Sequence, residues 1–269
     1  MEDERYNPHA RGKQNTITKA ELNPLSRVSH VIGVLSGKGG VGKSLVSSLV
    51  AVALNRLGRE VAILDADITG PSIPKSFGIT SKAYGEHDVI IPGYSKTGIQ
   101  IMSANMLLES DDDPILWRGP LIGDLVKQFY TDVFWREVDY MVVDMPPGTG
   151  DVALTTFQSL PVSGIIIVTT PQDLVASIVQ KAIKMAQQMN IKILGIIENM
   201  SYVECPDCGK KIHIYGESHA EKTAKKFNVP FLGALPIDPE LSRLVDAGEI
   251  EKANTKRFTK TIEVILENG

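Results

Sequence analysis

A glycine-rich turn near the start of the chain is suited to holding phosphate groups. Residues 36–44 read Ser-Gly-Lys-Gly-Gly-Val-Gly-Lys-Ser, after an apolar run and before a stretch typical of a helix. Gly37, Gly42, Lys43 and Ser44 match G-x-x-x-x-G-K-[ST], the pattern of a P-loop. Glycines let successive N–H groups converge, and the helix directs the positive end of its dipole at them. We therefore expect Lys43 to contact nucleotide phosphates and Ser44 to bind Mg²⁺. The alternative is a glycine-rich turn that binds nothing.

Lys38 is a second lysine in this turn, directly after its first glycine, where an ordinary P-loop needs no cation. With it, the sequence GKGGVGKS resembles the deviant Walker A motif of the MinD, ParA and nitrogenase-iron-protein class. The resemblance implies that Lys38 reaches across a dimer to the nucleotide of the partner. The alternative is a solvated loop lysine.

Asp144 ends the apolar run 139–144, at the position of a Walker B aspartate. There it would hold the hydration shell of Mg²⁺, although a helix-capping aspartate is the alternative. Residues 144–151 resemble a switch II, since two prolines stiffen the segment and two glycines let it move near a γ-phosphate.

Asp65 and Asp67 alternate at the end of a second apolar run, so they cannot both face the nucleotide in the same way. Resemblance to the same class implies that Asp67 orients the attacking water, within a switch I stretch at 67–72. Asp65 would then lie nearer the Mg²⁺ and lysine network. A structural carboxylate is the alternative for each. Catalysis would consist mostly of positioning and of neutralising charge with Mg²⁺, Lys43 and a cross-dimer Lys38.

Asn199 follows a late apolar run, and its amide could both donate to and accept from the edge of a base. In the resembled class this strand-end asparagine contacts adenine, whereas a turn asparagine is the alternative. ATP rather than GTP rests on the resemblance, since the chain has no guanine-specific N-K-x-D sequence. The residues that we expect to bind nucleotide are Gly37, Lys38, Gly39, Gly40, Val41, Gly42, Lys43, Ser44, Leu45, Asp65 and Asn199.

Cys205 and Cys208 are the two cysteines of the chain, and they form a C-x-x-C pair. Such a pair presents two thiolates to one metal, but a tetrahedral site or a cubane cluster wants four ligands. A two-fold dimer that brings two pairs together is the simplest completion. The alternatives are an intrachain zinc site with His213 and His219, a redox dithiol, and inert core cysteines.

Apolar runs alternate with helical stretches along most of the chain, and this pattern predicts the elements that position these residues. We expect a doubly wound α/β fold with a mostly parallel sheet flanked by helices, of the P-loop NTPase type. Strands are expected at 30–35, 60–67, 98–104, 139–144, 164–170, 191–197 and 230–235, with surface loops and short helical pieces at 68–98. Residues 1–28 predict a flexible tail, and residues 29–269 one ATPase domain with the cysteine segment inserted at about 202–216.

The composition is typical of a soluble globular protein. The chain has 269 residues, 43% hydrophobic residues and a formal net charge of −4. This charge argues against a broad nucleic-acid surface, and the chain contains no apolar run of membrane-spanning length. The N-terminus lacks the apolar core of a signal peptide. We expect a cytoplasmic protein that binds neither nucleic acid nor a membrane.

Together, GKGGVGKS, DADITGPS, WRGP, DMPPGTGD, ENMS and CPDCG resemble the Mrp/ApbC family of P-loop ATPases, which are iron–sulfur cluster carriers and scaffolds. The resemblance implies slow ATP hydrolysis coupled to a [4Fe–4S] cluster that bridges a homodimer through Cys205 and Cys208 and is delivered to apoproteins. The chain lacks the extra N-terminal cysteines of eukaryotic cytosolic relatives and the small N-terminal domain of longer bacterial forms. The alternatives are a positioning ATPase of the MinD/ParA kind and a zinc-stapled regulatory nucleotide-binding dimer.

Overall fold

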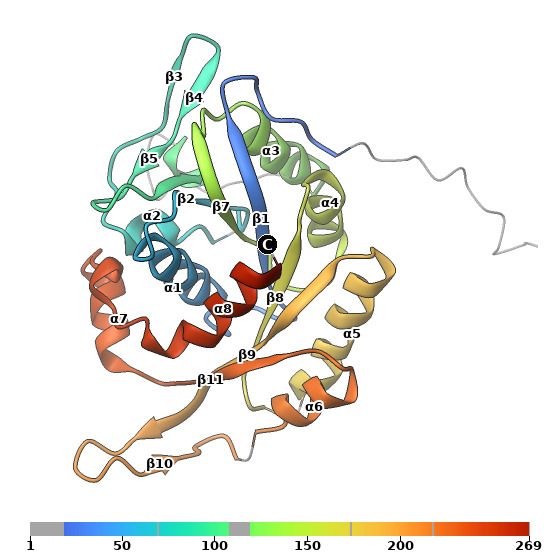
Figure 1. Ribbon diagram of the computed structural model, residues 1–269, viewed down its shortest axis with the longest axis vertical. Coiled ribbons are helices and arrows are strands. Elements are labelled where there is room, and N and C mark those ends of the chain that lie inside the picture. Colours follow the sequence, from blue (N-terminus) through green and yellow to red (C-terminus); the bar gives the residue numbers. More distant parts are fainter. Residues whose placement is uncertain (1–18, 69, 108–118, 173, 217, 269) are drawn as a thin grey trace, which may run out of the picture.

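The structure is a computed structural model that describes residues 19–268 except for 69, 108–118, 173 and 217 (Figure 1). Its main sheet contains nine strands: β1 (Arg27–Ser36), β2 (Val61–Asp65), β5 (Gly93–Tyr94), β6 (Gln100–Ser103), β7 (Glu137–Asp144), β8 (Gly164–Thr169), β9 (Lys192–Glu204), β10 (Lys211–Ile212) and β11 (Phe231–Pro236). Their order is β10-β9-β8-β1-β7-β2-β6-β5, and β11 also pairs with β9. All pairings are parallel except those of β5 and β10, so the predicted α/β sheet is confirmed.

Helices cover both faces of this sheet (Figure 1). They are α1 (Lys43–Asn55), α2 (Ile73–Ser76), α3 (Gly119–Thr131), α4 (Asp151–Ser159), α5 (Leu174–Gln188), α6 (Ala220–Lys226), α7 (Pro239–Asp246) and α8 (Thr259–Asn268). Short 3₁₀ turns lie at Ala104–Met106, Ile250–Lys252 and Lys256–Phe258. Helices α3 to α6 contribute to one buried apolar cluster, and α1, α2, α7 and α8 contribute to the other.

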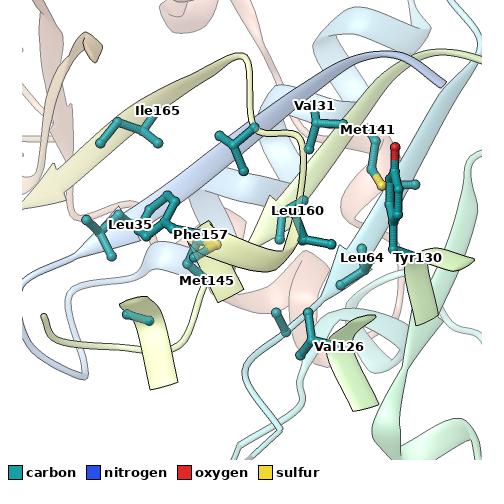
Figure 2. Close-up of a cluster of buried hydrophobic side chains, with 14 of the residues drawn as sticks. Val31, Leu35, Leu64, Val126, Tyr130, Met141, Met145, Phe157, Leu160 and Ile165 are labelled. Carbon is teal, nitrogen blue, oxygen red and sulfur yellow. The ribbon is translucent and has the colours of Figure 1, made fainter. Parts of the chain in front are cut away.

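The two clusters explain why the strands read as continuous apolar runs. Along β1, Val31 and Leu35 point into the first cluster, while Ile32 and Val34 point into the second. Phe157 of α4 packs in the first cluster (Figure 2). Successive side chains of a strand alternate between the two faces of a sheet. When helices cover both faces, both sets of side chains are buried and the strand is apolar along most of its length.

Several elements differ from the sequence expectation. The first strand begins at Arg27 rather than at residue 30, and the strand expected at 191–197 continues to Glu204. The stretch expected to be loops and helical pieces contains a hairpin of β3 (Tyr84–Glu86) and β4 (Val89–Ile91). The sequence also predicts a helix that opens at 117–120 and a second helix capped by Asp173, but residues 117, 118 and 173 lie outside the described residues.

The described end of the expected N-terminal tail lies against the domain. The amide N–H of Ala20 donates to the carbonyl of Ser159 across 2.8 Å. The side-chain amide of Asn23 donates to the carbonyls of Thr131 and Val133 at 3.0 and 2.8 Å. Residues 19–26 therefore cover the ends of α3 and α4. Within the part of the chain that the structure describes, no helix is long and apolar enough to span a bilayer.

Candidate functional site

The phosphate loop connects the end of β1 to the start of α1. Gly40 and Gly42 have φ angles of 77° and 80°, in the left-handed region that L side chains avoid. Gly42 directly precedes the helix, so the unpaired N–H groups of the first helical turn open toward this loop. The structure thus places the loop at the carboxyl edge of the parallel strands, where such folds bind ligands.

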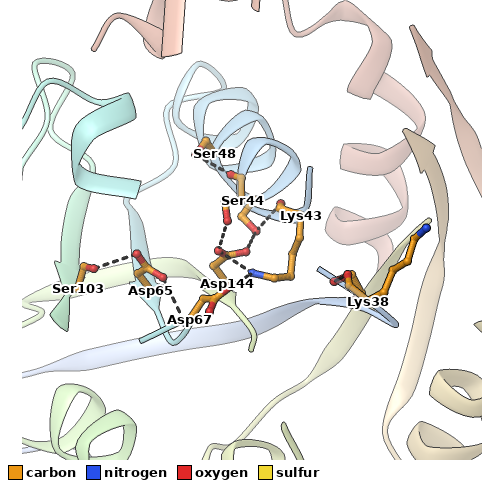
Figure 3. A network of polar contacts seen from close by, with 10 residues as sticks. Lys38, Lys43, Ser44, Ser48, Asp65, Asp67, Ser103 and Asp144 are labelled. Atoms are coloured by element: carbon orange, nitrogen blue, oxygen red, sulfur yellow. Dashed lines mark hydrogen bonds and ion pairs between the residues drawn. The ribbon is translucent and has the colours of Figure 1, made fainter. Parts of the chain in front are cut away.

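Lys43 lies at the centre of a buried charge cluster beside the loop (Figure 3). Its Nζ is 2.8 Å from Oδ2 of Asp144 and 3.4 Å from Oδ2 of Asp67. Only 5% of the lysine side chain is exposed, and the side chain of Asp144 is fully buried. Despite these ion pairs, the buried Nζ has no hydrogen-bond acceptor of ordinary geometry among the described residues. An ammonium in this state can donate hydrogen bonds to phosphate oxygens.

Two hydroxyls of α1 hold the carboxylate of Asp144 from the other side. Ser44 Oγ donates to Oδ2 across 2.6 Å, and Ser47 Oγ donates to Oδ1 across 2.7 Å. A hydroxyl and a carboxylate in contact form the oxygen donor set that Mg²⁺ prefers. The residues therefore fit the predicted magnesium site.

The aspartates at the end of β2 divide differently from the expectation. Asp67, rather than Asp65, makes the ion pair with Lys43. Asp65 Oδ2 accepts a hydrogen bond from Ser103 Oγ at 2.9 Å, and its Oδ1 accepts one from the backbone N–H of Asp67 at 3.2 Å. Burial, followed by the charge of Asp144, raises the pKa of Asp65 to about 8. Asp65 thus supports the backbone turn that carries Asp67.

Lys38 is not part of this cluster, and its side chain extends away from it (Figure 3). Its Nζ donates to Oε1 of Gln172 across 2.6 Å, in the loop between β8 and α5. The carbonyl of Lys38 accepts a hydrogen bond from Ser36 Oγ at 2.9 Å, which fixes the backbone. The second lysine of the loop is therefore held on the outer side of the site.

Asn199 lies within β9 and not after its strand, so the expected strand end was wrong. The strand continues because β11 pairs with it as far as Tyr202 and β10 pairs with its last two residues. Asn199 is buried, and its Nδ2 donates to the carbonyl of Val41 across 2.9 Å. A Cβ at Gly42 would lie 2.2 Å from that nitrogen. The asparagine thus packs directly beneath the phosphate loop.

A cavity of about 260 Å³ adjoins Asn199 on the side of α1 and α7. Its walls include Leu45 and Leu49 of α1, Leu235 of β11 and the carboxylate of Asp238. Apolar walls with a few polar groups are typical of small-ligand sites. The cavity has the composition expected for a flat heterocycle next to the phosphate loop.

The cysteines lie on a hairpin that extends from the end of β9, which we call the cysteine arm (residues 203–216). Cys205 follows β9 directly, and its N–H donates to the carbonyl of Lys210, closing the turn. Cys208 is exposed and Cys205 is partly exposed, and both thiols are free. Hydrogen bonds from the backbone of Cys208, then from that of Asp207, lower the pKa of Cys205. The arm therefore presents both cysteines at the surface, and its turn favours the thiolate form of Cys205.

The described residues contain no group of three or more His, Cys, Asp or Glu side chains that could hold a metal ion. Nδ1 of His213 lies 3.2 Å from the carbonyl oxygen of Ser201, and its ring packs near Tyr202. The intrachain zinc site with His213 and His219 is therefore not assembled here. The exposure of Cys208 also contradicts the alternative of inert core cysteines.

Several contributing residues were absent from the sequence expectation, among them Ser47, Gln172 and Glu198. Ser47 follows Ser44 by three positions, so helical spacing alone would have placed both on one face. Gln172 carries no sequence signal that relates it to Lys38. Glu198 is fully buried and accepts hydrogen bonds from the hydroxyls of Ser201 and Ser218 at 2.6 and 2.8 Å. The sequence analysis did not single out Glu198, because a glutamate side chain is normally expected at the protein surface.

Comparisons with known proteins agree with this geometry. The family model described as NUBPL iron-transfer P-loop NTPase matches residues 27–268. The iron-sulfur cluster carrier protein of Clostridium perfringens is 42% identical over 233 residues, which cover 84% of this chain and 82% of that protein. A solved nucleotide-binding protein from Archaeoglobus fulgidus, in complex with ADP and with cobalt, is 41% identical with a TM-score of 0.78, covering 86% of this chain and 91% of that one. The cell division ATPase MinD of Pyrococcus furiosus shares the fold at 19% identity and a TM-score of 0.62, covering 90% of this chain and all of that one.

Proposed function

Because the chain belongs to the NUBPL iron-transfer family of P-loop NTPases, we propose that it is an ATP-hydrolysing carrier of an iron–sulfur cluster. The observation that carries the proposal is the course of β9. This strand holds Asn199 beneath the phosphate loop and leads directly into Cys205, so one element serves both the nucleotide site and the thiols. The relative from Clostridium perfringens, named a cluster carrier, supports the same cargo.

The nucleotide site is proposed to bind ATP with Mg²⁺. Lys43 would bind phosphate oxygens with its buried ammonium, and Ser44 and Asp144 would hold the metal. The ion supplies charge neutralisation for the phosphates. Asp67 would orient water, since its backbone N–H donates to Asp65 and its carboxylate pairs with Lys43, the residue proposed to bind the phosphates. The cavity beside Asn199 would take the adenine, and the ADP complex of the Archaeoglobus relative supports a nucleotide here.

The cargo is proposed to be a [4Fe–4S] cluster shared by two copies of the chain. One arm supplies two thiolates, and a cubane needs four ligands. Ile212, Ile214 and Tyr215 are exposed beside the cysteines, by 46%, 53% and 44%. Apolar side chains exposed next to a half-complete ligand set favour contact with a second copy. The homodimer would then deliver the cluster to apoproteins.

Zinc at the same paired thiolates is the second candidate, because Cys₄ zinc sites have the same donor set. Free thiols also fit a reducing compartment, so we place the protein in the cytoplasm.

Anaerobic reconstitution with iron and sulfide tests the proposal. We expect a dimer with about one cubane per two chains, and no retained cluster in Cys205→Ser or Cys208→Ser. Iron and sulfide bound equally by Cys205→Ser would refute the cluster site. Zinc in place of iron after anaerobic purification would support the zinc candidate instead. In both variants, unchanged nucleotide binding is the control that the domain remains folded.

A further inference from the structure

A groove of about 450 Å³ lies at the base of the cysteine arm and outside the nucleotide site. It runs between β9, β10, β11 and α6, which lie together at one end of the molecule (Figure 1). Tyr202 and Phe231 supply apolar wall, and the hydroxyls of Ser201 and Ser218 lie in it. Both hydroxyls donate to the buried Glu198, so their hydrogens are already used.

The rim of this groove is basic on a chain whose net charge is −4. Lys211 lies with its Nζ 4.4 Å from the ring centre of Tyr202. Lys225 pairs with Glu221 at 2.9 Å, while Lys222 makes no ion pair within the described residues. Three lysines therefore face one carboxylate on the rim, and the local field favours an anionic partner.

The arm presents different chemistry on its two sides. Lys211 and His213 line the groove, whereas their neighbours Ile212 and Ile214 are exposed and do not. This alternation is what an extended segment produces. A second copy that covers the apolar side would therefore leave the basic groove open next to Cys205.

We propose that this groove docks an acidic polypeptide segment of the protein that receives the cluster, an inference that rests on the proposed carrier function. The lysines come from two separate elements, β10 and α6. β10 is the last strand of the sheet order, so its outer edge offers backbone groups that an extended peptide can pair with. Both features suit an extended acidic chain better than a small anion. Binding through exposed lysines is weakened by added salt.

Fluorescence anisotropy with a labelled octaglutamate peptide and the full chain tests the docking site. We expect saturable binding that weakens about tenfold or more in Lys211→Glu/Lys222→Glu and weakens with added salt. The matched control is Lys96→Glu/Lys127→Glu, which makes the same charge change on exposed positions near β5 and on α3. If the double variant is unstable, the single variant Lys222→Gln takes its place. It leaves Lys211 over Tyr202, and we expect it to lose less peptide affinity.

Three results would overturn the docking site. They are an absence of peptide binding, an equal loss in the control pair, and competition by inorganic phosphate or single-stranded DNA at the same charge concentration as the peptide. Cys205→Ser separates the two proposals, because peptide binding should persist there while the cluster is lost. A protein that holds its cluster but not the peptide contradicts only the docking site.

Discussion

The side-chain amide of Asn199 donates a hydrogen bond to the carbonyl of Val41 across 2.9 Å, joining β9 to the phosphate loop. A Cβ added at Gly42 would lie 2.2 Å from the same amide nitrogen. The loop and the strand are therefore in contact with no space between them, and the fit depends on glycine at this position.

Gly42→Ala should destabilise the protein, because the new methyl meets Asn199 and φ is 80°. We expect the free energy of unfolding to fall by about 1–3 kcal/mol in urea titrations. The matched control is Gly39→Ala, where an added Cβ has no neighbour within 4 Å and φ is not left-handed. Equal stability of the two variants would contradict the close contact.

Lys38 should act on the nucleotide of the partner, since its own chain holds it on Gln172 and away from Lys43. We expect Lys38→Ala and Asp67→Asn each to lose ATP hydrolysis. Mixed in equal amounts, they should recover about a quarter of the wild-type rate, because half of the dimers then contain one complete site.

The control for this complementation is a mixture of Lys38→Ala with Lys38→Ala/Asp67→Asn, which can form no complete site and should stay inactive. Failure of the first mixture to recover, with exchange of subunits verified by size, would mean that Lys38 acts within its own chain.

The phosphate loop and the strand-end aspartate Asp144 could be predicted because local spacing determines both. The second partner of Lys43 could not be predicted, since Asp67 lies beyond the end of β2, where turn geometry decides the direction of the side chain. The length of β9 depends on pairing with β11, about thirty residues later in the chain, which no local pattern records.

The β3–β4 hairpin was missed for a reason of turn chemistry. Its turn residues His87 and Asp88 have φ angles of 46° and 66°. Two-residue hairpin turns with two positive φ angles normally contain Asn-Gly or Asp-Gly, and this pair gives no such signal. The pairing in the cysteine arm was missed for a different reason, since it covers only two residues on each strand.

Because Asp65 keeps its proton in the folded state, the protein without nucleotide and Mg²⁺ should become less stable as pH rises and that proton is lost. Its pKa is raised to about 8 in the folded chain, whereas an unfolded aspartate titrates near 4. Between these values only the folded state keeps the proton, so the unfolding free energy should fall by up to about 1.4 kcal/mol per pH unit.

Asp65→Asn removes this titration and should flatten the pH profile of urea unfolding between pH 4 and 8. Asp139→Asn is a matched control, since among the described residues that carboxylate accepts a hydrogen bond from one exposed backbone N–H, that of Glu60. A profile for Asp65→Asn as steep as that of the wild type would refute the assignment.

Cys205 should react with iodoacetamide at lower pH than an ordinary thiol, because backbone N–H groups of Cys208 and Asp207 stabilise its thiolate. In Cys208→Ser, which keeps those N–H groups, we expect the midpoint of the rate profile to lie below about 8.5. The same variant in denaturant provides the reference, and coincident midpoints would show that the turn does not activate the thiol.

Because β9 continues into the cysteine arm, a movement of the strand at the phosphate loop also moves the cysteines. Asn199 and Cys205 are six residues apart, and the backbone between them bends at Met200, whose φ is 56°, so about 20 Å is the upper limit of their separation. Rotating this segment by about five degrees at the phosphate loop displaces its far end by up to about 2 Å, close to the length of one metal–sulfur bond. A movement too small to reorganise the core is thus large enough, at the tip, to make or break coordination.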